Sequence, residues 1–179
     1  GQIRACNRQP KADLRTGKRA GASGARMALL RKENGCMYLK QLSVFIENRE
    51  GRLEEVLDVL KKNNINIVSL SLADTSDYGL LRLLVTEPEA GRKALNENGF
   101  SAMLTDVLGV KLRHKVGCLQ ELLEVICKSH INIEYMYALE TGNDDASIVM
   151  KTSDLEKATE LLKETDVEFV TQDEIRETV

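Results

Sequence analysis

Long apolar runs, closely spaced cysteine pairs and clustered histidines are all missing from this sequence. No stretch approaches the roughly 20 consecutive apolar residues of a membrane-spanning helix, and the first residues lack the basic-then-apolar pattern of a secretory signal. The four cysteines form no CxxC pair and have no histidine at zinc-ligand spacing, which argues against structural zinc and a disulfide scaffold. With 42% hydrophobic and 30% charged residues, the composition favours a soluble, cytoplasmic globular protein with no membrane partner.

Charge is divided unevenly along the chain. Residues 1–36 hold nine Lys or Arg against two acidic residues, a net charge of +7, whereas the remainder holds 16 basic against 26 acidic residues, a net charge of −10. The first 36 residues have no apolar periodicity, so we expect a disordered or non-native leader that ends just before Met37. The alternative is a basic arm that contacts nucleic acid or an acidic partner. The leader has no interleaved aromatic residue, and we expect no nucleic-acid partner.

An internal repeat is the most informative feature of the sequence. The segment GRLEEVLDVLKKNNINI, Gly51 to Ile67, matches GCLQELLEVICKSHINI, Gly117 to Ile133, at nine of 17 positions. Most of the other positions differ conservatively, so chance is a poor explanation. The chain therefore contains two copies of one structural unit.

Each copy shows the same succession of periodicities. Apolar residues alternate in a first strand, recur at helical spacing in the segment after the loop, and alternate again after an Asn-Asn or Ser-His helix end. A turn-rich stretch then separates two strands, and a second helix follows, opened by Pro88 in the first copy and by Ser153 or Asp154 in the second. The expected third strands span 79–85 and 146–151, and the expected final strands span 101–105 and 167–172.

The order β-α-β-β-α-β, repeated twice, predicts an α+β fold. Such units form a ferredoxin-like, four-stranded antiparallel sheet with both helices on one face. We place the first module at residues 38–106 and the second at residues 107–177. Since helices already cover one face of each sheet, we expect the two modules to join through strand edges, which would also remove exposed edges.

The same topology serves several functions, and each function needs its own residues. An RNA-recognition sheet needs aromatic rings on its third strand, and GLLRLLV and ASIVMK have none. A metal-transfer domain needs CxxC in its first loop, where this chain has NREG and HKVG. Arg49 alone is a weak basis for an acylphosphatase-like phosphate site. We therefore expect neither a metal nor a cofactor.

The loops and the second-strand starts carry a family resemblance. A strand that ends in a polar residue, a short glycine loop and an apolar helix residue occur at 46–53 and 113–119, and an aliphatic-Asn-Ile element follows at 65–67 and 131–133. This arrangement resembles the ACT domain family over residues 38 to about 175. The resemblance implies a tandem ACT protein that binds an amino acid and regulates metabolism, with no catalytic domain attached.

The loop before the first helix of each copy has the chemistry of a carboxylate site. Gly51 and Gly117 precede helix starts, where free backbone N–H groups and the positive end of the helix dipole favour an anion. Asn48 offers a donor and an acceptor. The ACT resemblance places the effector between this loop and the second-strand region of a neighbouring unit. The resulting candidate ligand-binding residues are Asn48, Arg49, Glu50, Gly51, Arg52, Leu53, Asn66, Ile67, His114, Lys115, Gly117, Cys118, Leu119 and Asn132.

Each of these residues also has a purely structural interpretation. The glycines can serve the turn alone, the asparagines can satisfy backbone groups between helix and strand, and the charged loop residues can be solvated. The family's loop proline is absent from both copies, with Glu50 in the first, and His114 stands where the first copy has Asn48. The first loop is therefore the better candidate. Tyr135 and Tyr137 share one strand face, and we expect them to pack in an ACT–ACT interface rather than against a ligand.

Three functions compete. The first is a regulatory or sensory module with a small-molecule amino-acid effector, working as a homodimer. The second is a detached regulatory subunit that binds a biosynthetic enzyme and has vestigial ligand sites. The third, an enzyme, is disfavoured, because the only histidines are His114 and His130 and helical geometry makes a Cys118–His114 pair a poor nucleophile and base.

Overall fold

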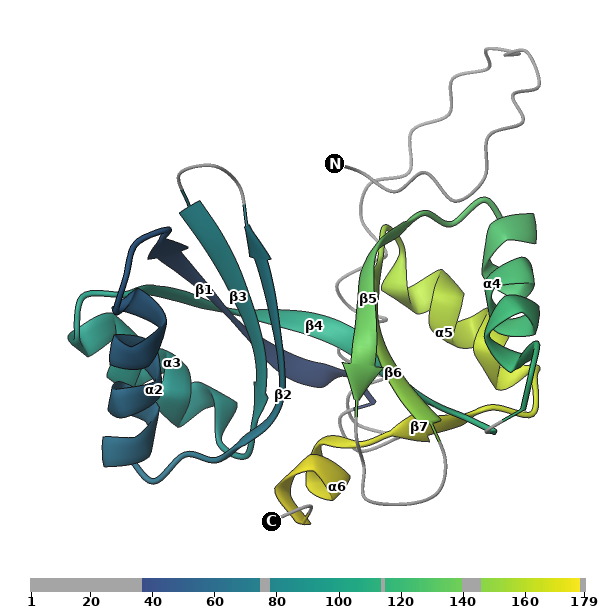
Figure 1. Ribbon diagram of the computed structural model, residues 1–179. Coiled ribbons are helices and arrows are strands. Elements are labelled where there is room, and N and C mark those ends of the chain that lie inside the picture. Colours follow the sequence, from purple (N-terminus) through teal and green to yellow (C-terminus); the bar gives the residue numbers. More distant parts are fainter. Residues whose placement is uncertain (1–36, 75–77, 114, 140–145, 178–179) are drawn as a thin grey trace, which may run out of the picture.

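The structure, a computed structural model, describes residues 37–74, 78–113, 115–139 and 146–177 (Figure 1). The predicted leader and His114 lie outside these residues. None of the described helices is long and apolar enough to cross a membrane. The elements are β1 (Leu39–Glu47), α2 (Arg52–Lys62), β2 (Ile67–Asp74), β3 (Tyr78–Val85), α3 (Pro88–Glu97), β4 (Ser101–Leu112), α4 (Cys118–Lys128), β5 (Ile133–Leu139), β6 (Ala146–Thr152), α5 (Leu155–Lys163), β7 (Glu168–Val170) and α6 (Gln172–Glu177).

The predicted double βαββαβ architecture is confirmed. In the first module the strands lie in the order β2-β3-β1-β4, and in the second in the order β5-β6-β4-β7, all antiparallel. The strand β4 serves both sheets: it pairs with β1 up to Val107 and with β6 from Leu108 onward. We call the part up to Val107 module 1 and the part from Leu108 module 2. The bounds predicted from the sequence, 38–106 and 107–177, divide the chain one residue earlier.

Equivalent positions in the two modules follow from strand register. Leu42 of β1 corresponds to Leu108 of β4, and their strand partners are Leu83 and Met150. The two partners are separated along the chain by one residue more than Leu42 and Leu108 are. Module 2 is therefore longer by one residue between its second and third strands. Equivalent residues differ in number by 66 up to the second strands and by 67 from the third strands onward.

Each module has its own helix-covered core. Val56 and Leu60 of α2 and Leu95 of α3 pack on the inward residues of β1 and β3, and α4 and α5 cover the second sheet in the same way. Helical apolar spacing in the sequence points Ala90 and Leu119 toward the core, but both are exposed. The inward position of α3 is taken by Gly91 instead of Ala90, and Leu119 lies in the first turn of α4.

The modules pack through their helix-free faces, which is more than the edge-to-edge junction expected from the sequence. Figure 1 shows α2 and α3 on one outer side of the molecule, α4 and α5 on the other, and the sheets between them. A third apolar cluster fills the space between the sheets: Leu39, Leu84, Val107, Leu139, Val149, Val170 and Ile175. The face opposite the helices is therefore buried as well as the helix-covered face, so each sheet is covered on both sides at the junction.

Helix α6 was not predicted. It follows the short strand β7 and places Ile175 in the cluster between the sheets. Thr171 and Glu174 form a capping box: the Glu174 N–H donates to Thr171 Oγ1 at 3.3 Å, and the Thr171 N–H donates to Glu174 Oε2 at 3.4 Å. The sequence signal Thr-x-x-Glu was therefore present, beginning at Thr171 inside the segment expected to be the final strand and ending at Glu174 just beyond it.

Candidate functional site

The two loops before α2 and α4 have the same backbone conformation. Gly51 and Gly117 stand at the helix N-caps with φ of 84° and 97°, a left-handed conformation that side chains rarely adopt. A Cβ at either position would meet nothing within 4 Å. The glycines are therefore required by the backbone turn, and in that turn the first N–H of each helix bonds back into the loop: Arg52 N–H donates to Arg49 O at 3.4 Å and Cys118 N–H to Lys115 O at 3.3 Å.

In the first loop, the charged side chains pair with one another and with nearby residues of the same module. Arg49 Nε lies 2.8 Å from Glu47 Oε2, and Arg52 pairs with Glu55. The guanidinium carbon of Arg52 lies 4.7 Å from the centre of the Phe100 ring, a cation–π contact. The Arg52 side chain therefore covers the space between the start of α2 and the residue that leads into β4.

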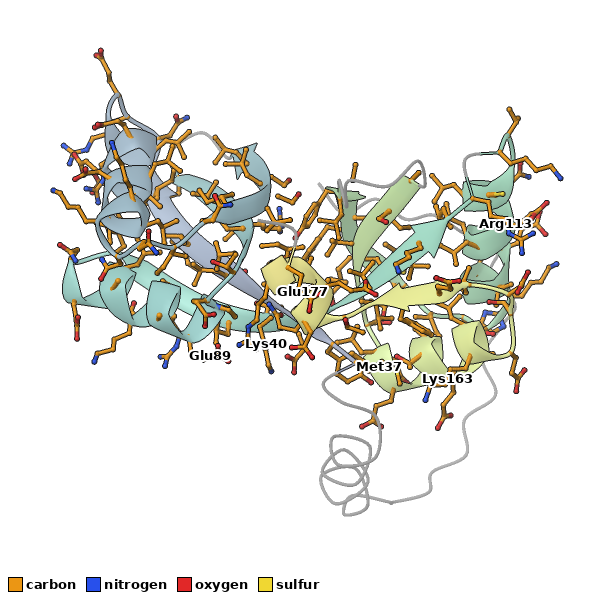
Figure 2. The ribbon with its side chains drawn as sticks, turned by 90° about the horizontal axis from the view of Figure 1, so that it is seen from below. Met37, Lys40, Glu89, Arg113, Lys163 and Glu177 are labelled. Atoms are coloured by element: carbon orange, nitrogen blue, oxygen red, sulfur yellow. The ribbon has the colours of Figure 1, made fainter. Side chains whose placement is uncertain are left out.

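The second loop borders a pocket of about 420 Å³. Leu112, Leu122, Val125 and Val167 form its apolar part. Its polar lining consists of Lys111, Arg113, Lys115, Cys118, Glu121, Thr165 and Asp166. We call this cavity the second-loop pocket. It lies at the outer end of module 2, where Figure 2 labels Arg113.

Comparison of equivalent positions explains why this space is open. Cys118 corresponds to Arg52, and Val167 corresponds to Phe100, since Lys111 pairs with Glu168 as Phe45 pairs with Ser101. Module 1 fills the space with a cation–π pair, whereas module 2 has two short side chains. A structural difference between the copies thus creates the pocket.

Charged groups surround the mouth of the second-loop pocket. Arg113 and Asp166, which both line the pocket, pair with each other, whereas the Lys111 ammonium lies on the helix-free face, 3.2 Å from Glu174 Oε1. Lys115 is exposed, and the free thiol of Cys118 is half-buried. Of the residues predicted from the sequence, Lys115 and Cys118 are brought together here. Arg113 and Asp166 were missed, since they lie far apart in the chain and nothing in the sequence links them.

Two of the predicted asparagines, Asn66 and Asn132, form hydrogen bonds where a helix leads into a strand. Asn66 Oδ1 accepts from the Ile67 N–H at 3.0 Å, and the Asn66 N–H donates to Thr86 Oγ1 at 3.2 Å. The Asn132 N–H donates in the same way to Ser153 Oγ. Asn66 and Ile67 line a separate pocket of about 700 Å³ at the C-terminal end of α2, so within module 1 they lie at the far end of that helix from Asn48.

A polar network links the modules through Gln41, a residue that the sequence did not single out. Gln41 is fully buried; its Nε2 donates to Tyr135 Oη at 3.0 Å, and its Oε1 accepts from Tyr137 Oη at 3.0 Å. The guanidinium carbon of Arg82 lies 4.0 Å from the centre of the Tyr135 ring. Burial raises the pKa of both tyrosines, with Tyr137 the more strongly affected. The predicted interface role of the tyrosine pair is confirmed.

Metal ligands do not gather in the part of the chain that the structure describes. Among those residues, no three His, Cys, Asp or Glu side chains come close enough to hold an ion.

Comparisons with known proteins agree with this architecture. A family model described as an ACT domain pair matches residues 37–179. A crystallised protein from Bacteroides thetaiotaomicron is 38% identical, with 78% of this chain and 96% of that chain covered and a TM-score of 0.74. The ligand-free regulatory subunit of aspartate kinase from Thermus thermophilus shares the fold at 14% identity, with 73% and 93% covered and a TM-score of 0.53.

A search of curated proteins found no match. The family model spans every described residue and both modules, and its description as a pair agrees with the two βαββαβ units joined by β4. This chain belongs to the family of ACT domain pairs.

Proposed function

We propose that this protein is a regulatory binding protein whose effector is an amino acid held in the second-loop pocket. The observation that carries the proposal is the position of that pocket, which opens beside the N-terminus of α4 at the loop that the ACT resemblance assigns to the effector. Its volume lies within the range of small-molecule sites, about 300–1,000 Å³. The sequence favoured the first loop, and the cation–π pair that occupies that loop moves the proposal to the second.

The lining has a partner for each part of an amino acid. The positive end of the α4 dipole and the Lys115 ammonium suit a carboxylate. Glu121 provides a carboxylate for the ligand's ammonium group, and Leu122, Val125 and Val167 provide apolar contacts for its side chain. Such a distribution favours an amino acid with an aliphatic side chain.

Regulation is proposed in place of catalysis because the lining offers charge and apolar complementarity to a ligand without a described nucleophile–base pair. We further propose that the protein acts as a homodimer in the cytoplasm. Effector binding would then change its contacts with a second copy or with a biosynthetic enzyme.

Calorimetric titration of the full chain with each of the twenty amino acids tests the site. The informative variant is Cys118→Arg, which introduces the residue that covers the equivalent space in module 1 and is expected to abolish binding. Cys118→Ser keeps the space open and is the matched control. Binding that survives in Cys118→Arg would place the effector elsewhere.

The same titration separates effector binding from partner binding. If none of the twenty amino acids binds the unmodified chain, the amino-acid proposal fails. A detached subunit that regulates a biosynthetic enzyme by direct contact then becomes the better account.

A further inference from the structure

An exposed apolar patch lies on the helix-free face of module 1. Phe45 of β1, Tyr78 of β3 and Met103 of β4 are 45%, 60% and 48% exposed. Phe45 pairs with Leu80 on one side and with Ser101 on the other, and Met103 pairs with Ser43, two residues before Phe45. The three side chains therefore belong to neighbouring positions of one sheet face, and we call them the module-1 patch.

The module-1 patch continues the interface that already joins the modules. Along β1, Gln41 and Ser43 are buried on this face, and Phe45 is the next residue to point the same way. Gln41 contacts Tyr135 and Tyr137 of module 2, and Ser43 pairs across the sheet with Arg82, which stacks on Tyr135. Module 2 thus covers one half of the face and leaves the other half open.

Module 2 is different at the equivalent positions. Lys111 stands where module 1 has Phe45, and it forms ion pairs with Glu168 and Glu174. Val170 stands where module 1 has Met103, and it is fully buried in the cluster that Ile175 of α6 completes. The chain therefore closes this face of module 2 with its own last helix and gives it a charged end, whereas the same region of module 1 carries large apolar side chains.

We propose that the module-1 patch is the contact surface between two copies of this chain, packed face to face about a twofold axis. In a twofold dimer the same surface meets itself, so the surface must be complementary to itself. Beside Phe45 on this face, Ala73, Leu80 and Ser101 are uncharged. Glu47, which pairs across the strands with Tyr78, is the charged neighbour, and its carboxylate already lies 2.8 Å from Arg49 Nε, which limits like-charge repulsion between two copies. Antiparallel sheets pack in this way at a spacing of about 10 Å, and large apolar side chains at the centre of a contact dominate its free energy.

This inference gives a surface to the homodimer proposed above, and the two can fail separately. Sedimentation velocity of the full chain over a wide concentration range measures the association. Phe45→Lys, which introduces the residue that module 2 has at this position, is expected to weaken the dimer by at least about 30-fold. Leu70→Lys is the matched control, because Leu70 is 49% exposed but lies on the helix side of the edge strand β2. It is expected to leave the association unchanged.

Three outcomes overturn the proposal. A monomeric unmodified chain would remove both the dimer and its surface. A dimer that persists in Phe45→Lys would keep the homodimer and move its contact elsewhere. Loss of the dimer in Leu70→Lys as well, with both variants unfolding at the same temperature as the unmodified chain, would place the contact at the β2 edge.

Discussion

Gly109 of β4 lies between Leu39 of module 1 and Val170 of module 2. A Cβ at this position would lie 2.6 Å from Leu39 Cδ1 and 2.9 Å from Val170 Cβ, and both neighbours are fully buried. Because Val170 Cβ is attached directly to the backbone of β7, it can move only with that strand. Gly109→Ala is therefore expected to lower the free energy of unfolding by about 1–3 kcal/mol, the usual cost of overpacking. Urea unfolding of the purified variant measures this change.

Gly91→Ala is the control for that substitution. Gly91 lies in α3, where module 2 has Ala158, and the closest contact of an added Cβ is the flexible Leu42 Cδ2 at 3.2 Å. Alanine also has the higher helix propensity, by about 1 kcal/mol. The free energy of unfolding is expected to stay within about 1 kcal/mol of the unmodified protein. If Gly91→Ala lowered the free energy of unfolding as much as Gly109→Ala, the effect at Gly109 could not be assigned to its contacts with Leu39 and Val170.

At the residue scale, sequence reasoning identified the glycines whose role is local. Gly51 and Gly117 stand between a strand and a helix in both copies, and the turn requires their conformation. Gly109 gave no comparable signal, because its constraint comes from Leu39 at the start of β1 and Val170 at the end of β7, both distant along the chain. The same applies to Gln41, whose partners lie in β5.

Helix α6 shows at the element scale that a short surface segment can be part of the core. Ile175 is fully buried between the sheets, whereas its neighbour Arg176 is exposed and pairs loosely with Glu87 at 3.6 Å. Ile175→Ala is expected to reduce the free energy of unfolding by about 2–5 kcal/mol. Arg176→Ala is expected to change it by less than about 1 kcal/mol, since exposed ion pairs contribute little. Chemical denaturation of the two variants checks both values, and equal effects would argue against the packing of α6.

The elements themselves were largely predictable, because periodicity is a local property and the repeat gave two readings of each element. The helix ends at Asn63 and Ser129 and the Asp154 cap of α5 agree with the sequence signals. The continuity of β4 was not predictable, since a strand that changes partners between Val107 and Leu108 has the same alternation as two strands in succession. For the candidate site, the sequence indicated the loops, but which loop has space depends on Arg52 and Phe100, far apart in the chain.

In the whole molecule, each sheet is buried on both faces: helices cover one face, and the other module covers part of the opposite face. The helix-covered faces are aliphatic and repeat between modules. The faces between the modules do not repeat: module 1 contributes Gln41, Ser43 and Arg82, and module 2 contributes Tyr135 and Tyr137. Such a network is directional, because each hydrogen bond requires its own partner, and it therefore fixes one arrangement of the two modules.

Tyr137 makes that network sensitive to alkaline pH. Burial raises its pKa above the ordinary value of about 10. Because the unfolded chain loses this proton at lower pH than the folded protein, the stabilisation from Tyr137 is complete below about pH 10 and is lost as the pH rises further. Urea unfolding from pH 8 to 10.5 is therefore expected to show a gap between the unmodified protein and Tyr137→Phe that narrows above about pH 10. A constant gap for Tyr137→Phe would show that the module interface admits the phenolate without cost.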